Sequence, residues 1–141
     1  MQLTQHTDFG LRLLIVLARE GGGPVALPAF AEEQGLSYHH VAKVAQALRR
    51  EGLIESRRGR SGGVALARPA GEITVGEVVR SLESGMRLAD CSTCALRDDC
   101  AASPMLAEAL EAFLAVLDRK TLADAARTGV HAFQAWSSPK P

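Results

Sequence analysis

The chain has 141 residues, which suffice for one compact domain with an added element or two but not for two full domains. Sixteen Lys and Arg balance sixteen Asp and Glu, so the net charge neither indicates nor excludes a nucleic-acid partner. The longest strongly apolar stretch, residues 13–18, is far shorter than the roughly 20 residues that cross a bilayer. Because the start of the chain also lacks an export signal, we expect a cytoplasmic protein with no membrane partner.

Residues 7–20 predict a first helix, because apolar residues recur there at helical spacing and a Gly-Gly-Gly-Pro run follows. Thr7 is the expected N-cap, and Asp8 is an acid placed in the first turn, where the helix dipole favours it. The expected apolar face consists of Leu11, Leu14, Ile15 and Ala18.

A helix-turn-helix motif is predicted next. A short helical segment over residues 29–33 stops at Gly35, and Ser37 then caps a longer helix that runs toward Gly52. The apolar face of this longer helix is expected to contain Val41, Val44, Ala45 and Leu48. A short helix, a turn with glycine and a capped helix in this order are typical of a DNA-reading module.

The pattern then changes to that of a β-hairpin, or wing. Residues 53–57 and 64–67 are strand candidates, joined by the turn-rich sequence GRSGG. From residue 43 to residue 68 seven basic side chains are opposed by two acidic ones, a local charge that suits a phosphate backbone.

Six side chains are candidates for binding double-stranded DNA. The recognition helix is expected to present His39, His40 and Lys43 to base edges in the major groove. The wing is expected to place Arg57, Arg58 and Arg60 against phosphates or in a narrow minor groove. The alternative interpretation of these arginines is a solvated loop.

Two further helices are predicted in the second half of the chain. Thr74 caps the first, with Glu77 at the capping-box position, and its apolar face holds Val75, Val78, Val79 and Leu82. The second covers residues 104–118, with an apolar stripe of Met105, Leu106, Leu110, Phe113, Leu114 and Leu117. A stripe of this kind needs a partner surface, and a second copy of the chain is one source.

The expected fold is therefore mostly α with a small β-hairpin: a winged helix-turn-helix followed by a long dimerisation helix. We divide it into a DNA-binding domain over residues 1–82 and a cysteine loop over residues 83–103 that contains a turn of helix. The dimerisation helix and a short C-terminal helix beginning at Thr121 occupy residues 104–128, and residues 129–141 form a tail.

Three cysteines lie close together in the predicted loop, at Cys91, Cys94 and Cys100, with the spacing C-x2-C-x5-C. Three is a poor number for a disulfide framework, whereas neighbouring thiolates in a reducing compartment can converge on one soft metal centre. They are one ligand short of the four that zinc sites and most iron-sulfur clusters use. A structural zinc site and unligated thiols are the alternatives to a cluster.

The fourth ligand is left open by the residues alone. Candidates within the loop are Asp90, Asp98 and Asp99, and candidates outside it are Asp8, His6 or a small molecule. An oxygen ligand leaves its iron labile, which suits a sensor better than an electron carrier. Asp8 also has an ordinary structural interpretation, in which it pairs with Arg12 one helical turn later.

Three stretches of the chain resemble a known family. They are MQLTQHTDFGLRLLIVLA, the segment from GLSYHHVAKV to EVVRSLE, and the cysteine loop followed by FLAVLDRKTLAD. Together they resemble the winged-helix family of iron-sulfur transcription regulators, and within it the nitric-oxide-sensing repressors, over residues 1 to about 126. The segment RGRSGGVALARPAGEIT and the cysteine loop are the specific parts of the match.

The resemblance implies a homodimer crossed through the long helix, with an iron-sulfur cluster near the interface. The cluster of such repressors is typically 4Fe-4S, with 2Fe-2S as the alternative, and it is held by three cysteines and an aspartate from the other subunit. By position these ligands are Cys91, Cys94, Cys100 and Asp8. The base-contacting positions fall at His39, His40 and Lys43, and the wing arginine falls at Arg58.

Two features of the cysteine loop bear on which branch of the family the chain resembles. The two-residue gap between the first cysteines is shorter than is usual in the nitric-oxide-sensing repressors, whereas the five-residue gap matches. Other branches carry a histidine shortly after the third cysteine, and here AASPML follows Cys100.

The predicted function is a cluster-dependent repressor that senses nitric oxide and releases its operator when the cluster is nitrosylated. One alternative is an iron- or redox-sensing regulator with a different cluster. A second is a small electron-transfer protein, which would have no use for a recognition helix and a wing. We expect no enzyme, because no paired histidine and nucleophile stand at a recognisable spacing.

Overall fold

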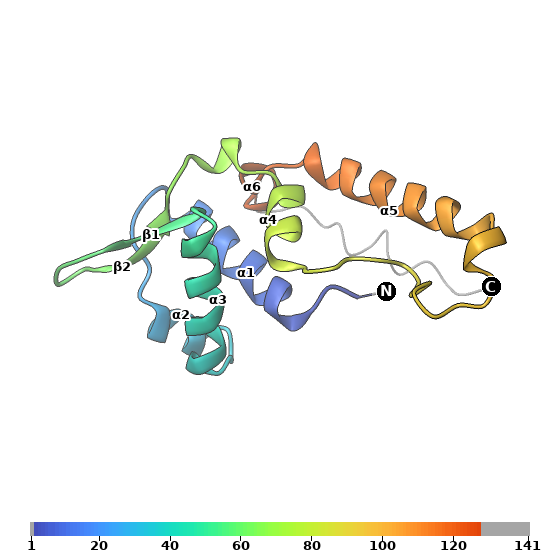
Figure 1. Cartoon of the computed structure of the whole chain (residues 1–141). Coiled ribbons are helices and arrows are strands. Elements are labelled where there is room, and N and C mark those ends of the chain that lie inside the picture. The colour runs from blue at the N-terminus through green and yellow to red at the C-terminus, as the bar shows by residue number, and fades with distance from the viewer. Residues whose placement is uncertain (1, 128–141) are drawn as a thin grey trace, which may run out of the picture.

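The computed structural model describes residues 2–127 as a winged helix-turn-helix body from which one long helix extends (Figure 1). The helices are α1 (Gln5–Arg19), α2 (Leu27–Glu33), α3 (Tyr38–Arg50), α4 (Val75–Leu82), α5 (Ala102–Asp118) and α6 (Leu122–Ala125). The strands are β1 (Ile54–Arg57) and β2 (Gly63–Leu66), and two short 3-10 helices are η1 (Ala70–Glu72) and η2 (Arg97–Asp99). The predicted fold class, mostly α with one hairpin, is confirmed.

Helix α1 begins earlier than its sequence predicts. The cap is Thr4, whose Oγ1 accepts a hydrogen bond of 3.3 Å from the backbone N–H of Thr7. The prediction of Thr7 as N-cap is therefore wrong: Thr7 lies inside the first turn and is fully buried. Asp8 lies in the first turn, as predicted.

The core of the body forms around α1, which contacts α3, α4 and α6. Leu14 is fully buried as expected, but Leu11, Ile15 and Ala18 are only partly buried. Leu13 and Leu17, which the predicted face omits, are completely inaccessible to solvent. A helix covered on several sides buries more than one stripe, which explains why a single amphipathic face did not describe it.

The helix-turn-helix is confirmed. Helix α2 starts at Leu27 rather than residue 29, with Pro28 in the first turn, where its missing N–H leaves no helical hydrogen bond unmade. Ser37 precedes α3 as predicted, although its side chain makes no capping hydrogen bond. The predicted apolar face of α3 is fully buried: Val41, Val44, Ala45 and Leu48.

The wing is an antiparallel hairpin in which Ile54 pairs with Leu66 and Arg57 pairs with Gly63. Its root is also joined to the chain before α2. Val25 and Val64 exchange two backbone hydrogen bonds of 2.8 and 2.9 Å. Gly63 permits this approach, because a Cβ there would collide with the Val25 carbonyl and lie 2.9 Å from the backbone nitrogen of Ala26.

Helix α4 packs between α1 of the body and α5. Thr74 caps α4 by accepting a 3.0 Å hydrogen bond from the backbone N–H of Glu77, as predicted. The return half of the predicted capping box is absent, because the Glu77 carboxylate pairs with Arg68 instead. Val79 of α4 packs with Leu110 and Leu114 of α5 in a second, smaller core.

Helix α5 begins at Ala102, two residues before the predicted start, and only part of its apolar stripe is covered. Leu110 and Leu114 are buried, whereas Met105 is 66% exposed and Leu106 is 37% exposed. Among residues 2–127 no helix combines the length and the apolar character needed to cross a membrane.

Helix α6 returns the chain to the body. It begins at Leu122, one residue after the predicted start at Thr121, and Thr121 caps it and forms a complete capping box with Asp124. The side chain of Leu122 enters the main core, and its N–H donates to the carbonyl of Ile73 at 2.9 Å. Residue 128 of the predicted dimerisation segment and the predicted tail over 129–141 lie outside the described residues.

Candidate cluster-binding loop and DNA-reading surface

The predicted base-reading residues share the exposed side of α3. All three side chains, His39, His40 and Lys43, are exposed, and the ring centroids of His39 and His40 are 6.1 Å apart. Sequence reasoning missed Tyr38, the first residue of α3, which is 54% exposed. The signal was present, since an aromatic residue directly after the cap of a recognition helix lies at the end that enters the groove.

The three wing arginines are exposed at the far end of the hairpin, which projects away from the body (Figure 1). Arg57 is partly engaged, because its Nε lies 3.3 Å from Glu55 Oε1. Arg58 and Arg60 form no ion pair with any of residues 2–127. The guanidinium groups of Arg58 and Arg60 are thus available to phosphates.

The cysteine loop connects α4 to α5 and runs alongside α5 (Figure 1). Cys91, Cys94 and Cys100 all carry free thiols. A backbone hydrogen bond of 3.4 Å from Cys94 N–H to the Cys91 carbonyl closes a turn between the first two. Within residues 2–127, however, no three His, Cys, Asp or Glu side chains are close enough together to hold a metal ion. Convergence of the three sulfurs therefore stays a prediction, although the donor set fits a soft metal.

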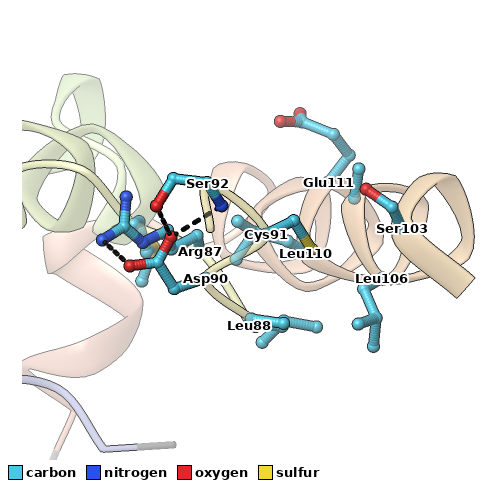
Figure 2. Close-up of a pocket in the computed structure, with 12 residues that line it drawn as sticks. Arg87, Leu88, Asp90, Cys91, Ser92, Ser103, Leu106, Leu110 and Glu111 are labelled. Atoms are coloured by element: carbon cyan, nitrogen blue, oxygen red, sulfur yellow. Dashed lines mark hydrogen bonds and ion pairs between the residues drawn. The ribbon is translucent and has the colours of Figure 1, made fainter. Parts of the chain in front are cut away.

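A groove of about 470 Å³ lies between the cysteine loop and α5 (Figure 2). Cys91 lines it beside the polar side chains of Ser92 and Ser103. The apolar part of the lining comes from both sides of the groove: Met86, Leu88, Leu106 and Leu110. One of the three thiols thus faces a partly apolar hollow against α5.

The acidic residues within the loop differ in how many hydrogen bonds and ion pairs their carboxylate oxygens already make. Asp90 Oδ1 accepts hydrogen bonds from the hydroxyl of Ser92 at 2.7 Å and its N–H at 3.0 Å, and Oδ2 pairs with Arg87 at 3.0 Å (Figure 2). The Ser92 hydrogen bonds, with the Arg87 charge, hold the pKa of the Asp90 carboxyl below its ordinary value. Asp98 pairs weakly with Arg97 at 3.3 Å. To ligate a metal through Oδ2, Asp90 would have to give up its ion pair with Arg87.

Asp8 has the structural partner that its spacing predicted. Its Oδ2 lies 2.7 Å from Arg12 NH2, and its Oδ1 accepts from Arg12 Nε at 3.2 Å. The side chain of Asp8 is still 46% exposed, so another molecule can reach it. Its role as cluster ligand stays a prediction.

A contact that the sequence did not reveal joins the start of α1 to the start of the cysteine loop. Glu83, the C-cap of α4, accepts hydrogen bonds at Oε1 from the backbone N–H of Thr4 at 2.6 Å and its hydroxyl at 2.9 Å. Burial alone would raise the pKa of the Glu83 carboxyl. Hydrogen bonds from Thr7 and Thr4, with the nearby charge of His6, outweigh burial and hold that pKa below its ordinary value.

Substituting Glu83→Gln is expected to lower the melting temperature near neutral pH but not in acid. A carboxyl with a depressed native pKa stabilises the fold above its unfolded pKa, and that contribution is lost as the pH falls through the native value. The difference in melting temperature between the two proteins should therefore shrink from about pH 7 to about pH 3. A pH-independent difference would contradict the assignment. Glu33→Gln is the control, because Glu33 is exposed and forms no ion pair among residues 2–127.

A short helix, a recognition helix and a basic wing define the class of this protein, a winged helix-turn-helix that binds DNA. The chain belongs to the Rrf2 family, since the family model described as "Iron-dependent Transcriptional regulator" matches residues 3–128.

Relatives and solved structures agree with this assignment. The chain is 40% identical over 130 residues to HTH-type transcriptional regulators named NsrR from Shouchella clausii and Halalkalibacterium halodurans. These matches cover 88% of this chain and 87% and 89% of the relatives. Among solved structures it is 32% identical to CymR, titled the global cysteine regulator of B. subtilis, with a TM-score of 0.76 over 89% of this chain and 96% of that one. T. potens IscR is 31% identical, with a TM-score of 0.74 over 89% of this chain and 85% of that one.

The family resemblance predicted from the sequence is therefore confirmed. The protein is a DNA-binding transcriptional regulator and not an enzyme.

Proposed function

We propose that the chain is an iron-sulfur-dependent repressor, which binds an operator as a homodimer and releases it in response to nitric oxide. The observation that carries this proposal is the set of three free thiols within ten residues, in a chain 40% identical to regulators named NsrR. Because its partner is chromosomal DNA, its place of action is the cytoplasm.

Cys91, Cys94 and Cys100 are the proposed cysteine ligands, and Asp8 of a second subunit is the proposed fourth. Thiolates are the soft ligands that iron-sulfur clusters prefer, and a carboxylate oxygen is the weakest of the four. When bound, the cluster, proposed as 4Fe-4S, supplies an iron centre that reacts with nitric oxide. To hold the cluster, Asp8 would have to release its ion pair with Arg12.

Helix α1 is the element that passes this change to DNA. It carries Asp8 in its first turn and packs directly against the recognition helix α3. A displacement of α1 therefore moves His39, His40 and Lys43 relative to the base edges. Each loss of about 1.4 kcal/mol costs tenfold in affinity, so a small displacement suffices to release DNA.

The proposed dimer interface is the exposed side of α5. Apolar side chains are uncovered there, with Met105 66% and Val116 48% exposed. Val116→Glu is expected to weaken dimerisation by about tenfold or more, because a carboxylate would be buried without a partner. Sedimentation over a concentration series measures the change, with Glu108→Gln on the same helix as control. An unchanged dimer would exclude this side of α5.

The test of the whole proposal is a gel-shift assay with anaerobically purified holoprotein and promoter DNA. Nitric oxide is expected to abolish the shifted band and to change the iron absorption in parallel. Operator binding that is unaffected by nitric oxide would refute the mechanism.

The family description as iron-dependent favours a second candidate, an iron- or redox-sensing regulator of the same fold. If this candidate is correct, an iron chelator or oxygen should release the protein from promoter DNA in the same gel-shift assay. Nitric oxide should then have no additional effect. Absorption spectra of the anaerobic protein before and after each reagent separate the two candidates.

A further inference from the structure

A small pocket of about 170 Å³ lies where the start of α1 meets the recognition helix α3. Gln5, His6 and Phe9 of α1 line one side, and His40, Lys43 and Val44 of α3 line the other. It is smaller than the roughly 300–1,000 Å³ of typical small-molecule sites. The pocket therefore accommodates one chemical group rather than a whole ligand of drug size.

The chemistry of the lining favours an anion. Lys43 is a cationic residue, His6 and His40 can donate hydrogen bonds from their rings, and Gln5 adds an amide. Among residues 2–127 no acidic side chain lines the pocket. Glu83, whose carboxylate interacts electrostatically with His6, is already hydrogen-bonded to Thr4.

The position of the pocket indicates which anion it would bind. Two of the α3 residues that line it, His40 and Lys43, also belong to the exposed side of α3 that we predict to face DNA. A helix in the major groove, which is about 12 Å wide, has a row of backbone phosphates on each side. A cationic hollow beside such a helix is therefore placed against one of these rows.

We propose that this pocket is a subsite for one DNA backbone phosphate in each half-site, with Lys43 and His6 as its principal ligands. The inference rests on the DNA-binding function proposed above. It changes the expected role of Lys43 from reading a base to holding a phosphate, and it adds His6 to the DNA-binding residues. Phosphate contacts fix the register of a recognition helix without reading sequence.

The test uses a synthetic duplex that the holoprotein has selected from a random pool, with single phosphates replaced by neutral methylphosphonates. For the unaltered protein we expect one position per half-site at which the replacement weakens binding by about tenfold, as for other charge-assisted hydrogen bonds. For His6→Gln and Lys43→Ala that particular penalty should disappear. Lys43→Ala should also lose about 0.9 in the slope of log affinity against log salt per half-site, because it removes the cation that pairs with this phosphate.

Lys120→Ala is the matched control, since Lys120 is exposed in the turn between α5 and α6, and it should keep the full penalty. Melting temperatures of the variants confirm that they are folded. Equal sensitivity of His6→Gln, Lys43→Ala and the unaltered protein at every position would overturn the subsite. Selection of no duplex at all would instead refute the proposed function.

Free phosphate is the other source of the same chemistry. Titration with inorganic phosphate against chloride at equal ionic strength, followed by NMR of the histidine rings, examines it directly. Saturable binding of inorganic phosphate at His6 and His40, together with duplex affinities unchanged in both variants, would overturn the assignment to DNA.

Discussion

Replacing Cys100 with serine is expected to prevent binding of the proposed iron-sulfur cluster and, with it, tight operator binding. A serine hydroxyl is a hard and weakly acidic donor, so it does not replace a thiolate on iron. The fold should survive, because Cys100 is only partly buried and lies outside both cores. Iron and sulfide content of anaerobically purified protein measure the first loss. A gel shift with the promoter measures the second, which we expect to be about tenfold or more.

Ser103→Ala is the matched control for Cys100. Ser103 lines the groove beside the loop, but it has no thiol and is not one of the predicted cluster ligands. We expect full iron content and unchanged DNA binding in this variant. If Cys100→Ser also retains iron and operator affinity, the thiols are not the ligands, and a regulator without a cluster remains.

Gly63→Ala is expected to destabilise the protein by about 2–3 kcal/mol and to weaken DNA binding. The added Cβ would collide with backbone atoms of Val25 and Ala26, which cannot rotate away as a side chain can. To relieve the collision, the wing root must separate from Val25 and lose the two backbone hydrogen bonds to Val64. Denaturant unfolding measures the stability, and operator affinity reports the displaced wing.

Gly71→Ala provides the control for this substitution. A Cβ at Gly71 meets no atom within 4 Å, and its backbone is not in the left-handed region. We expect its free energy of unfolding to match that of the unaltered protein. If the Gly63→Ala and Gly71→Ala proteins have the same free energy of unfolding, the wing root accommodates the added Cβ without loss of stability and the prediction is wrong.

The parts of the fold that follow from local signals were predicted well. The buried face of α3 and the cap of α4 each depend on residues within a few positions of one another. The start of α1 shows the limit of such reasoning. Thr4 and Thr7 are both reasonable caps, and the choice is set by Glu83, 79 residues away from Thr4, which bonds the Thr4 backbone and hydroxyl.

The candidate site was predictable in its residues but not in its geometry. Spacing alone located Cys91, Cys94 and Cys100 in one loop and Asp8 in the first turn of a helix. The convergence of the three sulfurs would depend on the proposed cluster and the proposed second subunit, and the spacing of the cysteines describes neither. The pocket between His6 and Lys43 escaped detection for a different reason, since it exists only where two distant helices meet.

The joint between Val25 and Val64 limits how this regulator can be switched. Because the hairpin is fastened to the polypeptide that leads into α2, the wing cannot swing independently of the helix-turn-helix. The helix-turn-helix and the wing therefore meet DNA as one rigid unit. A signal that displaces α1, which packs against both α3 and β2, is then expected to shift the recognition helix and the wing together.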